Sequence, residues 1–201
     1  MTIKIRVLQV IPRLGFGGAE TGCYDLAHFL AEQECKSFLI TSGGELLKFV
    51  RRDKVKVLRL PVHSKNPLII FVNSIIIFFI LLLYNIDIVH ARSRAPAWSC
   101  LWACFFSRKK FVTTFHGTYN FSNKIKLFYN SVMVRSQLTI AGSNFIFNHI
   151  NKNYQKYLNH SKKKLMVIFR GINLEYFNSK NISTRNADTL AQNWNIDKKN
   201  F

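Results

Sequence analysis

A glycine-rich turn near the N-terminus carries residue types that can bind an anionic or hydroxylated ligand. The stretch from Gly15 to Glu20 (GFGGAE) follows an apolar run and precedes a segment with the composition of a helix. Glycine lets backbone N–H groups approach a ligand closely, and a helix N-terminus adds a partial positive charge. A strand, a glycine turn and a helix in this order therefore predict an anion-binding corner that includes Gly17 and Gly18.

Because of Glu20, this turn does not match the dinucleotide-binding fingerprint G-x-G-x-x-G. Gly15 and Gly17 match its first two glycines, but Glu20 stands at the third. A carboxylate is an unfavourable neighbour for a pyrophosphate and a good hydrogen-bond acceptor for sugar hydroxyls. Two interpretations stay open here. The turn binds a sugar-bearing ligand, or it only needs glycines and Glu20 interacts favourably with the helix dipole.

Other polar residues and glycines follow later strand-like segments. Each of these residues comes just after a predicted strand: Arg92, Ser93, His116, Gly117, Arg170 and Gly171. Ligands of open parallel sheets bind outside the carboxyl ends of the strands, so we expect these residues to lie near the glycine turn. Structural alternatives remain for three of them, with Arg92 and Arg170 as solvated arginines and His116 as a strand-end cap. The sequence shows neither a nucleophile–base set nor a metal-ligand pattern.

The elements that must position these residues alternate along the chain. Predicted strands cover residues 3–11, 36–41, 55–60, 86–90, 110–115, 138–141 and 164–169. Predicted helices cover residues 20–34, 45–52, 68–84, 95–106, 123–135, 144–157 and 187–194. Strands that alternate with helices predict an α/β fold, a Rossmann-like open parallel sheet of about seven strands with helices on both faces. The alternating apolar and basic residues of 55–60 indicate an edge strand, and His90 is expected to be a buried core histidine.

Composition limits the class of partner. The chain has 201 residues, a net charge of +19 and 48% hydrophobic residues. The charge favours an anionic partner, although an AT-rich genome would also enrich lysine. Nucleic acid is not expected, because the cations are scattered and no nucleic-acid motif is present. Four cysteines without a C-x-x-C pair, and the lack of a signal-peptide pattern, favour a cytoplasmic protein with reduced thiols.

The most apolar segment, residues 68–84, is short for a transmembrane helix. Its apolar run is interrupted only by Asn73 and Ser74. It is interpreted as a helix packed on the sheet with one lipid-facing stripe, rather than as a membrane span, because the flanking strands belong to one sheet. Lys65, Arg92 and Arg94 are then candidates to meet acidic headgroups. We therefore expect a peripheral contact with the inner face of the cytoplasmic membrane.

The order of five short motifs resembles the N-terminal domain of glycosyltransferase family 4. The motifs are GGAE, DIVHARS, TFHG, AGSNF and VIFRGINLEYF, and they span nearly the whole chain. The family implies a GT-B fold of two Rossmann-like domains and transfer of a sugar from a nucleotide sugar with retention of anomeric configuration. It implies no metal or other cofactor. Phe169 stands where many members have proline, which is a departure from the last motif.

The resemblance also implies roles for several residues. Gly17 and Gly18 close over the donor phosphates and sugar, and His116 borders the reacting sugar. The turn at Arg170 and Gly171 leads towards the interdomain linker. The N-terminal domain mainly holds the acceptor, which we expect to be a cell-envelope glycan or a lipid-linked molecule.

The family's second domain has no counterpart in this sequence. Its basic pair and its E-x(7)-E donor motif find no match after Phe177. We therefore expect residues 1–177 to form the acceptor-side domain, and residues 178–201 to be a linker and the start of a missing domain. On this interpretation the chain is truncated or is half of a split enzyme, with its C-terminal half encoded separately, and it is inactive alone. A non-catalytic basic module that binds an acidic membrane, and the remnant of a decayed gene, remain as alternatives.

Overall fold

The computed structural model describes residues 4–158, 164–171, 174–175 and 177–196. The chain divides into two units, Met1–Phe169 and Arg170–Phe201. The second unit contains a short 3-10 helix, η3 (Ser179–Asn181), and the helix α6 (Thr184–Asn193). Ser183 caps α6 by accepting a hydrogen bond from the backbone N–H of Asn186. The predicted domain boundary at 177/178 falls inside this second unit, whereas Ile172, Asn173 and Tyr176 of the last motif lie outside the described residues.

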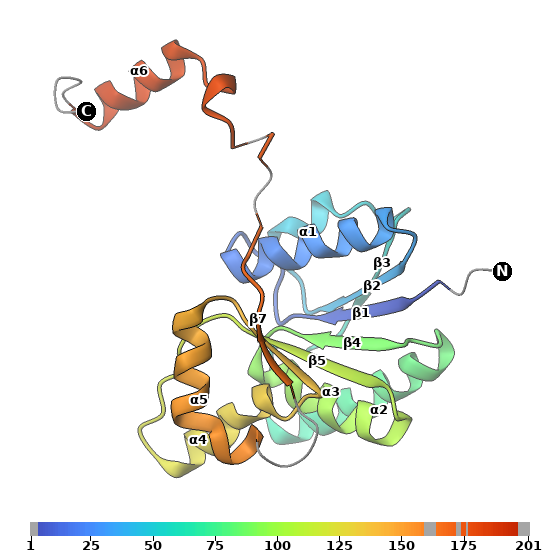
Figure 1. The fold of residues 1–201 in the computed structure, drawn as a ribbon. Coiled ribbons are helices and arrows are strands. Elements are labelled where there is room, and N and C mark those ends of the chain that lie inside the picture. The colour runs from blue at the N-terminus through green and yellow to red at the C-terminus, as the bar shows by residue number, and fades with distance from the viewer. Residues whose placement is uncertain (1–3, 159–163, 172–173, 176, 197–201) are drawn as a thin grey trace. The chain divides into compact units, whose positions relative to one another are not determined.

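The first unit is built on a seven-stranded sheet in which every described strand pair is parallel (Figure 1). The strands are β1 (Arg6–Val10), β2 (Lys36–Thr41), β3 (Val55–Arg59), β4 (Ile88–Ala91), β5 (Lys110–Phe115), β6 (Leu138–Ala141) and β7 (Lys164–Val167). Their order is β3-β2-β1-β4-β5-β6-β7, which confirms the predicted Rossmann-like sheet and places β3 at an edge. The chain runs outward from β1 to β3 and then crosses to β4, so β1 and β4 meet at the topological switch point.

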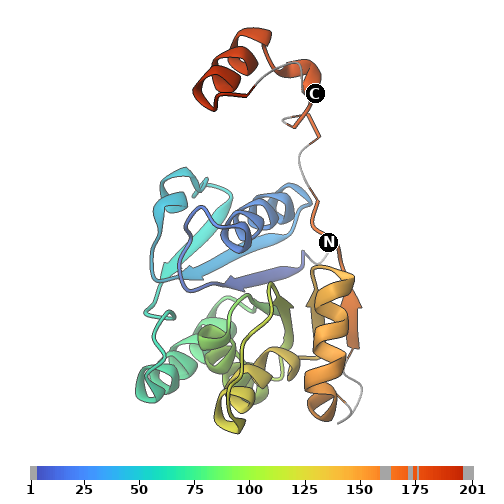
Figure 2. The same ribbon diagram turned by 90° about the vertical axis from the view of Figure 1, so that its left-hand side faces the viewer.

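Helices cover both faces of the sheet, as the alternation of elements predicts (Figure 2). One face is covered by α1 (Gly18–Glu32) and the 3-10 helix η1 (Glu45–Phe49). The elements that cover the other face are α2 (Pro67–Leu83), α3 (Arg94–Ser107), α4 (Lys124–Asn130), the 3-10 helix η2 (Ser131–Val134) and α5 (Asn144–Leu158). The cap predicted for α5 is present, because the backbone N–H of Ile146 donates to Oγ of Ser143 at 3.2 Å.

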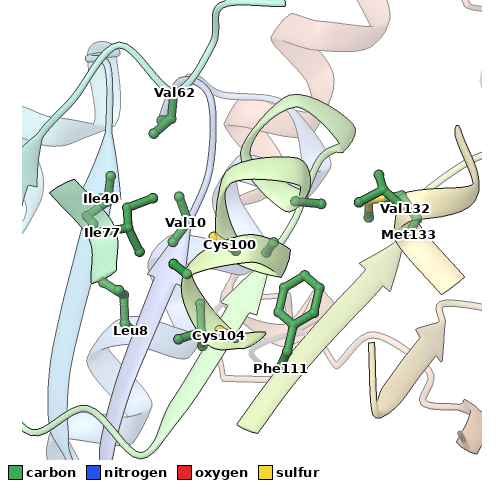
Figure 3. Close-up of a cluster of buried hydrophobic side chains, with 14 of the residues drawn as sticks. Leu8, Val10, Ile40, Val62, Ile77, Cys100, Cys104, Phe111, Val132 and Met133 are labelled. Atoms are coloured by element: carbon green, nitrogen blue, oxygen red, sulfur yellow. The ribbon is translucent and has the colours of Figure 1, made fainter. Parts of the chain in front are cut away.

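The larger hydrophobic core lies between the sheet and α2, α3 and η2. Leu8 and Val10 of β1 pack there with Ile77 of α2, and Cys100 and Cys104 of α3 point into the same cluster (Figure 3). The two thiols lie one helical turn apart on the buried face of α3, as their spacing predicts. Burial raises the pKa of the Cys104 thiol to about 12, so this side chain acts as a small apolar group.

The helix predicted over 123–135 is present as two helical elements of different kinds. The α-helix ends at Asn130, and η2 takes its place over Ser131–Val134. The tighter turn brings the side chains of Val132, Met133 and Val134 into the core, where all three are fully buried. A hydrogen bond holds this turn on the sheet, because Oγ1 of Thr113 donates to the carbonyl of Met133 at 2.6 Å. A bond between residues so far apart in the sequence leaves no trace in local periodicity.

Helix α2 packs on the sheet with its polar residues inward. Its buried residues are Asn73, Ser74, Ile77 and Leu81. The side-chain amide of Asn73 donates to the carbonyl of Pro61 at 3.2 Å, which ties the helix to the loop after β3. None of the helices in the described ranges is both long enough and apolar enough to cross a membrane. The prediction of a packed helix is therefore confirmed, and the apolar outer side of α2 remains exposed.

The segment after β2 is hydrogen-bonded to the backbone of Leu14, which precedes the glycine turn. The backbone N–H of Leu14 donates to the carbonyl of Gly43 at 2.7 Å, and the N–H of Leu46 donates to the carbonyl of Leu14 at 2.9 Å. Gly44 has a φ of +130°, and a Cβ there would overlap the backbone of Leu14. Only glycine combines this backbone conformation with so close an approach, so Gly44 allows the two loops to pack together.

A change of Gly44 to alanine tests this packing. We expect Gly44→Ala to lower the free energy of unfolding by about 2–4 kcal/mol, because it adds both backbone strain and steric overlap. Gly142→Ala is the matched control, since a Cβ at that position meets nothing within 4 Å. Urea denaturation of both variants provides the measurement, and equal effects would contradict the close packing at Gly44.

A buried polar pair joins β4 to β5 next to the switch point. Nε2 of His90 and Oγ1 of Thr114 share a hydrogen bond of 2.7 Å, and both side chains are buried. Burial lowers the pKa of His90 from 6.5 to about 3, with further contributions from the charges of Arg92 and His116. The prediction of a satisfied core histidine is confirmed, and His90 stays neutral at physiological pH.

The lowered pKa of His90 has a consequence for stability in acid. Between pH 3 and pH 6.5 the unfolded chain binds a proton at His90 that the folded chain does not. The free energy of unfolding should therefore fall by up to about 1.4 kcal/mol per unit as the pH drops through this window. Urea denaturation at several pH values measures the slope, which His90→Gln should reduce and the exposed control His63→Gln should leave unchanged. Parallel curves for wild type and His90→Gln would contradict the assignment.

Candidate ligand-binding crevice

The switch point between β1 and β4 brings two of the predicted ligand-binding segments together. Val10 pairs with Ala91 in the sheet, and the backbone N–H of Arg92 donates to the carbonyl of Val10 at 3.0 Å. The glycine turn continues from β1, and Arg92 and Ser93 continue from β4. Because all strands run in the same direction, both segments leave the sheet at the same edge, which is the usual ligand-binding edge of such folds.

The glycine turn opens α1 with its backbone donors exposed. Gly17 is the N-cap residue and has no side chain to satisfy the first N–H groups of the helix. Gly18 begins the helix, and Gly17 and Gly18 are both exposed. The Glu20 carboxylate folds back towards Gly17, where an added Cβ would overlap it. The turn therefore presents N–H donors and one carboxylate acceptor side by side, a combination suited to a phosphate next to a sugar.

Arg92 is a buried cation at this edge of the sheet. We call the ends of β1, β4 and β5, with the residues that follow them, the candidate crevice. Its side chain is 8% exposed, and Nη1 donates to Oε1 of Gln9 at 3.1 Å. Nε2 of Gln9 in turn donates to the carbonyl of Cys23 on α1, at 3.1 Å. The described residues provide no carboxylate that forms an ion pair with Arg92, and its Nε has no hydrogen-bond partner among them. A buried positive charge without a counterion stabilises an anion that enters the crevice.

This burial corrects two expectations about the cations after β4. Arg92 is not solvated, and it lies too deep to meet lipid headgroups. Arg94 is also engaged within the domain, because its Nη1 donates to Oδ1 of Asn130 at 2.9 Å and its guanidinium lies 4.3 Å from the ring centre of Tyr119. Ser93 is the N-cap residue of α3, with a partly exposed side chain that makes no capping hydrogen bond. The first N–H groups of α3 therefore face the same edge of the sheet as those of α1.

His116 and Gly117 follow β5 at this same edge. His116 is half-buried, and its charge contributes to the lowered pKa of His90, which places the two imidazoles within electrostatic range. Gly117 is half-buried, and a Cβ there would meet nothing within 4 Å, so its lack of a side chain leaves open space beside His116. The predicted convergence of His116 with the segments after β1 and β4 follows from the strand order β1-β4-β5.

Arg170 and Gly171 belong to the second unit, where both are exposed. The crevice described above consists of residues of the first unit only, so the part these two residues play stays a prediction. In the described ranges, no group of three or more His, Cys, Asp or Glu side chains is arranged to hold a metal ion.

Sequence reasoning missed two residues of the crevice. Gln9 fixes the guanidinium of Arg92, and the signal for it was a single polar residue inside an otherwise buried strand. Glu45, the first residue of η1, reaches the glycine turn, where its Oε2 lies 3.3 Å from the position that a Cβ at Gly15 would take. Oε1 of Glu45 also pairs with Nη2 of Arg13 at 3.5 Å. No local pattern links Glu45 to the turn, because the two segments meet only in the folded sheet.

Comparison with known proteins identifies a family for this chain and solved structures that resemble it. The family model described as Glycosyltransferase Family 4 matches residues 16–176. A glycosyltransferase from Rickettsia africae ESF-5 is 36% identical with a TM-score of 0.79, and the match covers 98% of this chain and 51% of that one. Anabaena Alr3699/HepE, solved in complex with UDP and glucose, is 15% identical with a TM-score of 0.69, and the match covers 94% and 50%.

The lipopolysaccharide outer core galactosyltransferase WaaB in its apo form is 15% identical, with a TM-score of 0.58 and coverage of 85% and 47%. Among curated proteins, none matches the chain. The chain spans about half the length of the solved structures that it matches. The seven-stranded parallel sheet and the family match agree, and the chain belongs to glycosyltransferase family 4, with the Rossmann-like α/β architecture of its GT-B neighbours.

Proposed function

We propose that this chain is the acceptor-side domain of an enzyme that transfers a sugar from a nucleotide sugar to an acceptor hydroxyl, with retention of anomeric configuration. The observation that carries the proposal is that the N-terminus of α1 and the buried Arg92, which forms no ion pair among the described residues, lie at the same edge of the sheet. Family membership supports the reaction class. The complex of Anabaena HepE with UDP and glucose supports a nucleotide sugar as donor.

Each group in the crevice has a defined part in this proposal. The N–H groups at Gly17 and Gly18 and the guanidinium of Arg92 stabilise the negative charge that develops on the leaving diphosphate. Glu20 accepts hydrogen bonds from hydroxyls of the donor sugar or the acceptor. His116 orients the reacting sugar from the end of β5. Because the helix N-terminus and Arg92 supply positive charge, the proposal assigns no step to a metal or another cofactor.

We further propose that the acceptor is a cell-envelope glycan or a lipid-linked molecule. The positive net charge of the chain favours an acceptor with anionic groups. The structural likeness to WaaB, a lipopolysaccharide outer core galactosyltransferase, supports this class of acceptor. The four cysteines are free, and Cys23, Cys100 and Cys104 are buried, which supports a reducing compartment such as the cytoplasm.

Full turnover needs groups on both sides of a reacting sugar, so the 201-residue chain should bind ligands without turning them over efficiently. We propose that a second domain, in the same or a separate chain, completes the cleft. Ligand binding is therefore the property to measure on this chain.

Titration with UDP-glucose, followed by backbone amide chemical shifts, tests the location of the site. We expect the largest shifts at Gly17, Gly18 and Ser93, because these amides lie at the N-termini of α1 and α3. The site should saturate with a dissociation constant on the order of 1 mM, since one wall supplies only a few charge-assisted hydrogen bonds. Amides of α6 serve as an internal control. Shifts confined to residues away from the β1–β4 edge would contradict the site.

Glu20→Gln tests the part given to its carboxylate. We expect the affinity for UDP-glucose to fall about three- to tenfold and the affinity for UDP alone to stay the same or rise, because the carboxylate is assigned to hydroxyls of the glucosyl group, which UDP lacks. Asp25→Asn on the same helix is the control. Calorimetric titration of both ligands measures the difference. An equal loss of affinity for UDP and UDP-glucose would contradict a contact between Glu20 and the sugar.

A further inference from the structure

The outer side of α2 is apolar along its whole length. The exposed large hydrophobic residues of this helix are Leu68, Phe71, Val72, Ile75, Ile76, Phe79, Leu82 and Leu83. The neighbouring helices continue the surface with Trp102, Phe105 and Phe106 of α3 and Ile125 and Phe128 of α4. Contiguous apolar surface of this extent on a folded domain marks an interaction site. We call these exposed side chains the α2–α4 surface.

A groove crosses the α2–α4 surface between α2, α3 and α4. It has a volume of about 970 Å³, and most of its lining comes from aliphatic and aromatic side chains such as Phe71, Phe79 and Trp102. The charged or hydroxyl-bearing side chains along it are those of Lys65, Ser74 and Tyr129. The Ser74 hydroxyl is already used, because it donates to the carbonyl of Ile70 at 2.8 Å. The groove therefore offers hydrocarbon contact with very few hydrogen-bonding groups.

The charges around the α2–α4 surface have one sign. Asp87 is the only acidic residue between residues 54 and 174, and it accepts a hydrogen bond from the backbone N–H of Arg6 at 2.8 Å. Lys65 precedes α2, Arg108 ends α3, and Lys124 and Lys126 flank Ile125 on α4; all four are exposed. Cations bordering an apolar surface complement a layer of anionic headgroups above hydrocarbon.

We propose that the α2–α4 surface docks the domain on an anionic lipid bilayer, with hydrocarbon chains of the lipids entering the groove. Helix α2 remains part of the domain in this arrangement, because Ile77 and Leu81 are fully buried in the core and Asn73 is bonded to Pro61. Only its outer side enters the interfacial region. A protein partner fits less well, because protein interfaces form about one hydrogen bond per 100–200 Å² and this surface offers few such groups. The proposal does not depend on the transfer reaction.

Flotation of the 201-residue chain with lipid vesicles tests the proposal. Vesicles of phosphatidylglycerol and phosphatidylcholine should bind the chain at low salt, and pure phosphatidylcholine should bind it at least about tenfold less. High salt should weaken binding without abolishing it, because the apolar contact persists after the charges are screened.

Two pairs of variants separate this surface from non-specific adsorption. Phe79→Ser should weaken binding about tenfold, whereas Phe29→Ser on α1 should not change it, and the two side chains are 61% and 56% exposed. Lys124→Glu should weaken binding to the anionic vesicles, whereas Lys36→Glu, an exposed position at the start of β2, should have a much smaller effect.

Three results would overturn the proposal. The first is no binding of wild type to anionic vesicles at low salt. The second is an equal loss of binding in Phe79→Ser and Phe29→Ser. The third is self-association in analytical ultracentrifugation that Phe79→Ser removes while vesicle binding is unaffected, which would assign the surface to a second copy of the chain.

Discussion

The parallel pairing of β1 with β4 determines where the ligand-binding groups of this domain lie. Val10 and Ala91 are neighbours in the sheet, so the glycine turn and Arg92 leave it at the same edge. The N-terminus of α1 and the charge of Arg92 are then at the same edge of the sheet, although the guanidinium and its partner Gln9 are 83 residues apart in the chain. Reversing either strand would send one of these segments to the opposite edge. The strand order and the parallel pairing therefore determine which residues come together at this edge.

Local patterns located most elements of the fold because each buried strand is a short apolar run bounded by turn residues. They also identified the candidate site residues that follow β1, β4 and β5, since a parallel sheet collects such residues at one edge. They did not show that Arg92 is buried or that Gln9 and Glu45 reach the crevice, because these facts depend on contacts across the sheet. The break between α4 and η2 was hidden for the same reason: it is stabilised by a hydrogen bond from Thr113 on β5.

Helix α2 shows that composition predicts an apolar helix without predicting which of its sides is buried. Its hydrophobicity predicted a helix with an apolar stripe, and the structure shows that the buried side holds Asn73 and Ser74 while much of the apolar surface faces outward. The hydrogen bond from Nδ2 of Asn73 to the carbonyl of Pro61 offsets part of the cost of burying the amide, whose Oδ1 has no hydrogen-bond partner among the described residues. Helical periodicity alone cannot tell the inner from the outer side when nearly every position is apolar.

The position of β1 between β2 and β4 also bears on how the chain folds during synthesis. The backbone N–H of Arg6 donates to the side chain of Asp87, 81 residues later. More than a third of the chain must therefore be synthesised after β1 before β4, its second neighbour in the sheet, is available for pairing. Until then one edge of β1 has unpaired backbone groups, and the apolar α2 segment emerges from the ribosome before β4 can secure it. Such late closure is slow because the entropy of a long loop is lost before its contacts form. Binding of nascent α2 by a chaperone or a membrane surface would act in this interval, when the domain is most prone to aggregate.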